Sequence, residues 1–279
     1  MNFGLLPEKY SSYDNAAVVI LPVPYDQTST WLKGADKGPE AVIQASANME
    51  LYDIETDSQI YKKGIFTDSP LQTALLPEDM TNLVYERITQ LLEDGKFPVI
   101  VGGEHSVSIG AVKACSQNTE DMTVLQLDAH ADLRDEYDGS KFNHACVMAR
   151  IKELCPAVQV GIRSMDISEK ESIDPDKTFF AKDIVDTADW IQNVISLLSD
   201  NVYVTIDLDV FDPSIVPSTG TPEPGGLGWY EVLSLLKNLS SAKNIVGFDV
   251  VELCPNENNK APDFLAAKLI YKFLSYNFR

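Results

Sequence analysis

Short apolar segments alternate with longer amphipathic segments along the whole chain. A segment such as Val202–Ile206, with the sequence VYVTI, is apolar at almost every position, which is typical of a strand covered on both faces of a sheet. Strands that alternate with helices predict βαβ units and a parallel sheet. The predicted strands are Ala17–Leu21, Gly64–Phe66, Pro98–Val101, Thr123–Leu127, Val158–Gly161, Thr178–Phe180, Val202–Ile206 and Asn244–Val250. The predicted helices are Gly38–Ala47, Asp79–Asp94, Ser106–Cys115, Asp186–Leu198, Gly228–Leu239 and Ala261–Tyr276.

No repeat, low-complexity tract or long linker interrupts this alternation, so we expect residues 1–279 to form a single α/β domain. About eight strands also suit a (β/α)₈ barrel, and the periodicity does not exclude it. In a barrel and in an open parallel sheet alike, ligand sites form where the strands end at their carboxyl edge.

Two carboxylate-rich motifs each follow a predicted strand directly. They are Asp128-Ala-His130-Ala-Asp132 and Asp207-Leu-Asp209. Residues i, i+2 and i+4 of an extended segment share one face, so we expect the polar side chains of each motif to point together. A buried, unpaired carboxylate is unfavourable, and a bound cation removes that problem. The two motifs therefore indicate a metal site.

The chain has three histidines, His105, His130 and His144, and all fall between residues 105 and 144. His105 lies in Gly102-Gly-Glu-His-Ser106, where the glycines allow a tight strand-to-helix turn and Ser106 is expected to cap the helix. Imidazole and carboxylate together form a ligand set for Mn, Fe, Co, Ni or Zn. His144 has an ordinary pKa near 6.5 and is the natural general acid or base.

Further polar residues follow the last two predicted strands. Glu252 follows the last strand and either contacts a cationic substrate or is an ordinary surface carboxylate. The segment Thr219–Gly226 is dense in turn formers and is either a rigid loop or a wall of the active site. Asp212, which precedes a proline, is expected to cap a helix or to form an Asx-turn.

Composition limits the classes of function. The net charge of −20 argues against nucleic-acid binding, because there is no basic excess to neutralise phosphates. An acidic surface either maintains solubility or attracts a cationic substrate. The longest apolar stretch, Ala16–Leu21, is too short to span a membrane, and no signal sequence is recognised. Four scattered cysteines are then expected to be reduced thiols, and we expect a cytoplasmic protein.

Taken together, these motifs resemble the ureohydrolase (arginase/agmatinase) superfamily, in particular its agmatinase branch. The match covers most of the chain in order: Pro24-Tyr25-Asp26, Gly34, Gly38-Pro39, Gly-Gly-Glu-His105-Ser, Asp128-Ala-His-Ala-Asp132, His144, Asp207-Leu-Asp209-Val-Phe-Asp212-Pro, Thr-Gly-Thr221-Pro and Glu252. The resemblance implies an arginase-like fold, a three-layer αβα sandwich with an eight-stranded parallel sheet. It thereby removes the barrel alternative.

The resemblance also implies two Mn²⁺ ions per subunit. The first would be held by His105, Asp128, Asp132 and Asp207. The second would be held by Asp128, His130, Asp207 and Asp209. A hydroxide between the ions would attack the guanidinium carbon, which is a poor electrophile because of its resonance and positive charge.

The resemblance assigns roles to four residues around the ions. Glu252 is similar to the carboxylate that orients the guanidinium, and Thr221 to the hydroxyl beside it. Asp132 would carry a proton to the leaving amine, and His144 would act as proton shuttle and contact the substrate. The expected enzyme is a hydrolase of linear amidines that converts agmatine into putrescine and urea. Family members are usually trimers or hexamers, so a homo-oligomer is implied.

The choice of agmatine rests on the segments around His144. Arginases place Ser-x-Asn-x-His before this histidine, whereas the spacing in Gly139–His144 differs, and Leu133–Ser140 resembles the agmatinase branch. Glu104 and Glu223 also suit that branch. Three carboxylates are hypothesised to receive the distal ammonium, namely Asp135, Glu136 and Asp138.

Three alternatives remain open. A sister ureohydrolase would act on aminopropylagmatine, guanidinobutyrate, arginine, formiminoglutamate or guanidine itself. A deacetylase of related fold would use a single Zn²⁺. A metal-stabilised polyamine-binding protein would bind cations and release no urea.

Overall fold

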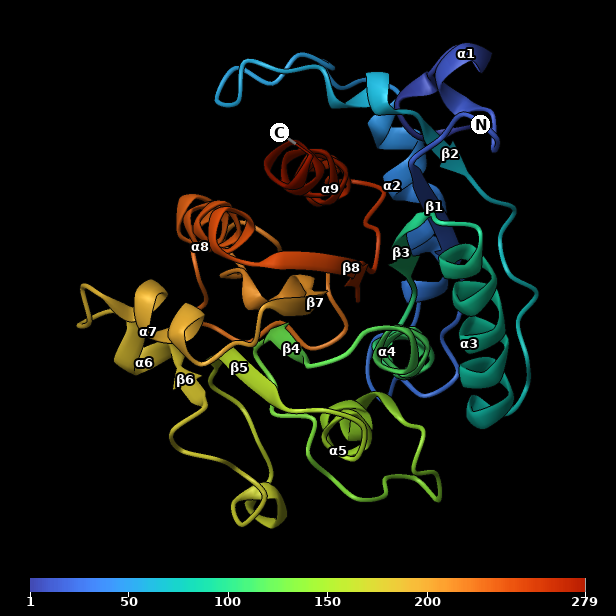
Figure 1. Cartoon of the computed structure of the whole chain (residues 1–279). Coiled ribbons are helices and arrows are strands. Elements are labelled where there is room, and N and C mark those ends of the chain that lie inside the picture. Colours follow the sequence, from blue (N-terminus) through green and yellow to red (C-terminus); the bar gives the residue numbers. More distant parts are fainter. Residues whose placement is uncertain (279) are drawn as a thin grey trace.

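The computed structural model describes residues 1–278 and has one open parallel sheet at its centre (Figure 1). Among these residues the sheet has eight strands in the order β2-β1-β3-β8-β7-β4-β5-β6. Two of its strands are edges, so the sheet is not closed and the barrel alternative is excluded. The strands are β1 Val18–Val23, β2 Ile65–Thr67, β3 Phe97–Gly102, β4 Met122–Leu127, β5 Ala157–Ile162, β6 Thr178–Phe180, β7 Asn201–Asp207 and β8 Asn244–Val251.

Helices cover both faces of the sheet, which makes three layers (Figure 1). Alternate residues along β1 show the division, because Val18 and Ile20 pack with one apolar cluster and Val19 and Leu21 with another. The first cluster includes α2 Gly38–Ser46, α7 Trp190–Ser196, α8 Trp229–Ala242 and α9 Ala261–Asn277. The second includes α3 Pro77–Glu93, α4 Val107–Asn118 and α5 Val147–Lys152. The predicted αβα sandwich is therefore confirmed.

The sequence pattern located all eight strands, with ends that differ by at most two residues. It missed three short helices, α1 Glu8–Ser11, α5 and α6 Ala181–Ile184, which have too few turns to show a helical period. It also merged a turn with α7, because the helix predicted to start at Asp186 begins only at Trp190.

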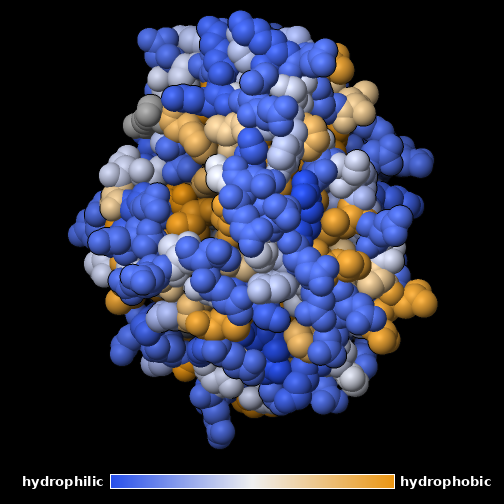
Figure 2. Space-filling model, turned by 45° about the vertical axis from the view of Figure 1, so that its right-hand side comes forward, coloured by the Kyte–Doolittle hydropathy of each residue, from blue (hydrophilic) through white to orange (hydrophobic). Residues whose placement is uncertain are grey.

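The face drawn in Figure 2 is largely hydrophilic, and its hydrophobic residues are scattered in small groups. Among residues 1–278, no helix combines the length and the apolar character that crossing a membrane requires.

Four neighbouring strands at the middle of the sheet position the candidate site. In sheet order they are β3, β8, β7 and β4. Their carboxyl ends lead into His105, Glu252, Asp207 and Asp128 respectively. Because the strands are parallel, these four chain segments, which are far apart in sequence, emerge at the same edge.

Candidate metal centre

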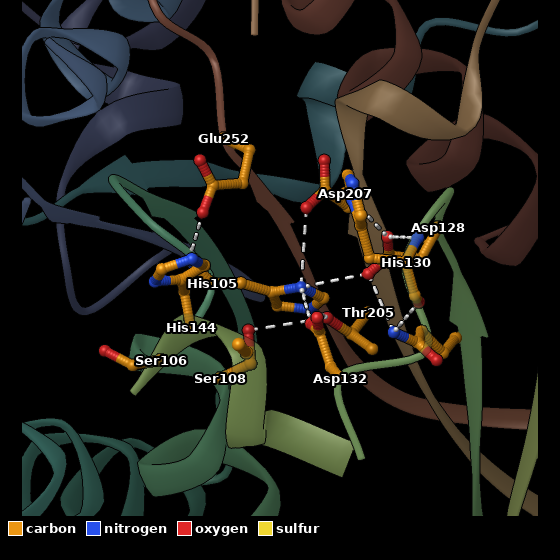
Figure 3. Close-up of polar contacts among 12 residues, drawn as sticks. His105, Ser106, Ser108, Asp128, His130, Asp132, His144, Thr205, Asp207 and Glu252 are labelled. Atoms are coloured by element: carbon orange, nitrogen blue, oxygen red, sulfur yellow. Dashed lines mark hydrogen bonds and ion pairs between the residues drawn. The ribbon is translucent and has the colours of Figure 1, made fainter. Parts of the chain in front are cut away.

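His105 lies at the centre of a buried carboxylate cluster. Its Nδ1 is 3.1 Å from Asp128 Oδ2, 3.1 Å from Asp132 Oδ2 and 3.4 Å from Asp207 Oδ2 (Figure 3). Burial of the ring opposes protonation, but the three carboxylates outweigh it and raise the pKa of His105 well above its usual value. The cluster thus attracts positive charge to the position that Nδ1 faces.

His130 forms the second part of the cluster. Its Nδ1 lies 2.8 Å from Asp209 Oδ2 and 3.7 Å from Asp128 Oδ1, so Asp128 reaches both histidines. Burial acts to lower the pKa of His130, yet the charges of Asp209 and Asp128 raise it to about 12. Two groups of possible ligands therefore share one carboxylate: His105, Asp128 and Asp132, and Asp128, His130 and Asp209.

These residues fit divalent cations on three grounds. His105 Nδ1 is buried and has no hydrogen-bond partner in the described part of the chain. Burial, with the nearby charge of Asp128, raises the pKa of Asp132 to about 7, and burial also raises that of Asp207. Repelling carboxylates around an unsatisfied imidazole nitrogen are stabilised by a bound cation. The mixed oxygen and nitrogen donors match the preferences of first-row transition metals.

The backbone that presents these ligands is less regular than the sequence predicts. Asp132 has φ 54° and Glu252 has φ 65°, in the left-handed region that non-glycine residues seldom adopt. Asp209 lies in a short 3₁₀ helix, Leu208–Val210, which the Asp207 side chain caps by accepting the Asp209 N–H at 2.8 Å. The expectation of two extended motifs is therefore wrong, because tight turns bring the side chains together. Such local strain is typical of functional sites.

A buried chain of hydrogen bonds holds the Nε2 side of the His105 ring. His105 Nε2 lies 2.9 Å from Thr205 Oγ1, and Thr205 Oγ1 donates to Asp249 Oδ1 at 2.6 Å. Tyr203 donates to the other Asp249 oxygen at 2.8 Å. Burial raises the pKa of Asp249, and these donors oppose that rise. Hydrogen bonding of this kind fixes the orientation of a metal-binding imidazole.

A cavity of about 280 Å³ opens above the cluster, and all the candidate ligands except Asp128 line it. His144, Thr221 and Glu252, predicted from the sequence to contact substrate, also line it. Glu252 Oε1 accepts the His105 backbone N–H at 2.8 Å (Figure 3). Burial, with the charge of Glu104, raises the pKa of Glu252 well above its usual value, so a guanidinium beside it would be favoured.

The hypothesis for the distal ammonium is not supported by the positions of its carboxylates. Asp135 is exposed and pairs with Arg150 at 2.6 Å and Lys141 at 3.3 Å. Neither it nor Glu136 or Asp138 is among the described residues that line the cavity. These three carboxylates are exposed, and the charge pattern alone did not indicate that they lie outside the cavity.

Other cavity residues were missed in the sequence. Asp166 lines the cavity, and its Oδ2 lies 4.0 Å from Arg134, which also reaches Glu169 at 3.9 Å. The Arg134 guanidinium stacks over the ring of Tyr137 at 4.4 Å. Asp166 is carried in by the segment after β5, whose Ser164 pairs with the His130 backbone. No motif marks this segment, so only the fold reveals its position.

Three minor predictions have clear outcomes. Asp212 forms the expected Asx-turn, since its Oδ1 accepts the Ser214 N–H at 3.0 Å. Ser106 does not cap its helix, because its hydroxyl donates instead to Glu104 at 2.7 Å. The four cysteines are free thiols, as expected.

A parallel αβα sheet with buried carboxylate and histidine ligands at its carboxyl edge defines a metal-binding class of α/β protein. Comparison with known proteins makes this specific. The family model described as Arginase family matches residues 16–275, and the chain therefore belongs to the arginase family. Members of this family are binuclear metal hydrolases.

Individual relatives cover nearly the whole chain. An N(1)-aminopropylagmatine ureohydrolase from Synechocystis sp. is 42% identical over 280 residues, which are 96% of this chain and 92% of the relative. An agmatinase from Pyrococcus horikoshii is 36% identical over 270 residues, with 95% and 93% covered. The structure of an agmatine ureohydrolase from Thermoplasma volcanium superposes with a TM-score of 0.89 at 32% identity, with 100% and 95% covered. The protein is therefore a ureohydrolase of the agmatinase type.

Proposed function

We propose that the protein hydrolyses the guanidino group of N(1)-aminopropylagmatine to release urea and a triamine, with Mn²⁺ as the metal. The observation that carries the chemistry is the convergence of His105, Asp128, Asp132 and Asp207 below a cavity that Glu252 and His144 line. The substrate is supported by the name of the Synechocystis relative. This choice differs from agmatine, the substrate predicted from the sequence.

Agmatine remains the second candidate. The Pyrococcus relative and the Thermoplasma structure both carry names that specify it. Both substrates have a guanidino group. Beyond that group agmatine has one ammonium, whereas aminopropylagmatine is longer and has two. We expect residues farther from the metal centre that line the cavity, such as Asp166, to distinguish the two substrates.

Each ligand has a proposed place. One cation would be held by His105, Asp128, Asp132 and Asp207, and the other by Asp128, His130, Asp207 and Asp209. When bound, such ions would lower the pKa of water and stabilise the negative charge that develops during the reaction. The protein's own residues would then orient the substrate: Glu252 would accept guanidinium N–H groups, and Thr221, which also lines the cavity, would contact the same group.

Two residues are proposed to handle protons. Asp132 lines the cavity beside the proposed cations, where it would accept and return a proton. It would pass this proton to the leaving amine nitrogen. His144 also lines the cavity and would exchange protons between the site and solvent. We further propose that the protein forms a homo-oligomer, a trimer or a hexamer, which light scattering would measure.

The proposal is tested by urea release from metal-stripped protein before and after reloading with Mn²⁺. The panel contains aminopropylagmatine, agmatine, arginine and guanidinobutyrate. The expected result is Mn²⁺-dependent urea release with the highest kcat/KM on aminopropylagmatine. Higher kcat/KM on agmatine would restore the prediction made from sequence. Mn²⁺ binding without urea release from any of these substrates would contradict the proposed reaction. The variants His144→Ala and Asp132→Asn serve as inactive controls.

A further inference from the structure

Two buried glutamines connect the neighbouring strands β4 and β5 next to the candidate metal centre. Gln126 on β4 and Gln159 on β5 are direct partners in the parallel register. Gln126 is fully buried, Gln159 is 3% exposed, and Gln126 stands two residues before Asp128. A buried amide is unfavourable unless its polar atoms are hydrogen-bonded, so the partners of this pair indicate its role.

The hydrogen bonds of the two glutamines end on the segment that carries the candidate ligands. Gln126 Nε2 donates to Asp128 Oδ2 at 2.7 Å and to the His130 carbonyl at 3.3 Å. Gln159 Nε2 donates to Gln126 Oε1 at 2.6 Å and to the Ala131 carbonyl at 2.8 Å. All four hydrogens of the two amide groups are therefore used. The pair holds both the Asp128 carboxylate and the backbone of the turn that follows it.

The acceptors at the ends of this chain of hydrogen bonds fix the orientation of both amides. A backbone carbonyl only accepts, so the nitrogen of Gln159 must face Ala131. The same nitrogen faces Gln126, which must present its oxygen there. The Gln126 nitrogen is thereby turned towards Asp128 and the His130 carbonyl. Neither amide can be reversed without placing one oxygen against another.

Asp128 places one carboxylate oxygen in each of the two groups of candidate ligands. Its Oδ2 lies 3.1 Å from His105 Nδ1 (Figure 3), and its Oδ1 lies 3.7 Å from His130 Nδ1. The Gln126 amide donates to Oδ2, and the His130 backbone N–H donates to Oδ1 at 2.6 Å. Rotation of the carboxylate would break both hydrogen bonds. Without the Gln126 amide, Oδ2 loses this donor and the carboxylate can rotate.

We propose that Gln126 and Gln159 are positioning residues that set the rotation of the Asp128 carboxylate, so that one oxygen faces each of the two proposed cations. Gln126 acts on the carboxylate directly, and Gln159 acts through Gln126. Hydrogen bonds to a ligating carboxylate orient it and tune its affinity for metal. The inference rests on the two-cation part of the proposed function, in which Asp128 is shared.

Calorimetric titration of metal-free protein with Mn²⁺ tests this role. Gln126→Met keeps the length of the side chain and removes the amide. We expect it to raise the dissociation constant for Mn²⁺ roughly ten- to a hundredfold, because the shared carboxylate loses its orientation. Gln159→Met should raise this constant roughly three- to tenfold, as loss of one hydrogen bond predicts.

The double variant tests whether the two glutamines act along one path. It should bind Mn²⁺ no more weakly than Gln126→Met does, because Gln159 acts through Gln126. An unchanged dissociation constant in Gln126→Met, or losses that multiply in the double variant, would overturn the proposal.

Thr123→Val is the matched control on the same strand. Thr123 is a buried polar residue of β4 whose hydroxyl oxygen accepts the Ser199 N–H at 3.2 Å. This variant should lower the Tm of the metal-free protein and leave the dissociation constant for Mn²⁺ unchanged. A rise in that constant as large as in Gln126→Met would overturn the proposal, because loss of any buried hydrogen bond in β4 would then weaken the site.

Crystal structures of metal-free wild type and Gln126→Met give a readout that depends on neither metal nor activity. In the variant we expect the Asp128 carboxylate to be rotated, so that Oδ2 no longer lies beside His105 Nδ1. A carboxylate in the wild-type orientation would overturn the proposal. Gln159→Met gives the same comparison should Gln126→Met not fold. If the wild type binds no Mn²⁺ or releases no urea, the proposed function fails, and the orientation of Asp128 still decides this inference.

Discussion

His105 Nε2 lies 2.9 Å from Thr205 Oγ1, so Nδ1 is the nitrogen left to face the carboxylates of the candidate metal centre. Thr205 in turn donates to the buried carboxylate of Asp249. Its hydroxyl must therefore accept the hydrogen of Nε2, since its own hydrogen is already used. Thr205 thus selects the His105 tautomer that has a free lone pair on Nδ1.

Replacing Thr205 by Val should therefore weaken metal binding. We expect the dissociation constant for Mn²⁺ to rise roughly ten- to a hundredfold, because the imidazole loses its orienting partner and Asp249 loses a donor. Isothermal titration of metal-free protein measures this directly. Thr205→Ser, which retains the hydroxyl, is the control and should bind Mn²⁺ nearly as the wild type does. Unchanged affinity in Thr205→Val would show that packing alone holds the ring.

The pH dependence of metal binding follows from Asp132. Burial and the charge of Asp128 raise its pKa to about 7 in the metal-free protein, from an ordinary value of 3.8. A group whose folded-state pKa is raised contributes stability below its unfolded pKa, and that contribution is lost as pH rises through 7. Metal binding requires the deprotonated carboxylate, so affinity for Mn²⁺ should increase as pH rises through the same range.

Two measurements check this sign. Titrations at pH 7 in buffers with different ionisation enthalpies should show that Mn²⁺ binding releases protons. The difference in Tm between Mn²⁺-loaded and EDTA-treated protein should widen from about pH 6 to about pH 8. In the Asp132→Asn variant, this difference in Tm should depend less on pH. A gap in Tm that narrows with rising pH would contradict the assignment of Asp132.

The sequence predicts the sheet and most of the candidate site for a physical reason. The apolar strands and the motifs that follow them can be recognised from neighbouring residues in the sequence. Because parallel strands place their carboxyl ends at one edge of the sheet, Asp128 and Asp207 lie close together. Residues placed by loops were not predictable in this way. Asp166 reaches the cavity because Glu169 accepts backbone N–H groups of both Leu133 and Asp166. Neither contact leaves a pattern in the sequence.

Gly103 shows how tightly the turn before His105 is packed. A Cβ added at this position would lie far inside van der Waals contact with the Tyr25 carbonyl. We expect Gly103→Ala to lower the free energy of unfolding by more than about 3 kcal/mol, since two hydrogen-bonded backbone segments would have to separate. Gly95→Ala is the control, because Gly95 has φ 68° and open space around it. That variant should lose only about 1–2 kcal/mol from backbone strain. Urea denaturation compares the two, and equal losses would refute the packing argument.

Asp166 is expected to decide which distal group the cavity accepts. Its carboxylate lines the cavity and makes only a 4.0 Å contact with Arg134, which also reaches Glu169 at 3.9 Å, so Asp166 can contact a substrate ammonium. Asp166→Asn keeps the capping of its 3₁₀ helix, because asparagine caps as well as aspartate. We expect KM for aminopropylagmatine to rise about tenfold, as loss of a charged hydrogen bond predicts. KM for guanidinobutyrate, whose distal group is negative, should stay unchanged or fall.

Asp135→Asn is the matched control and should leave both values unchanged, since Asp135 is exposed and paired with Arg150. An equal rise in KM for aminopropylagmatine in Asp135→Asn and Asp166→Asn would instead indicate that the loop after Asp132 binds the distal ammonium.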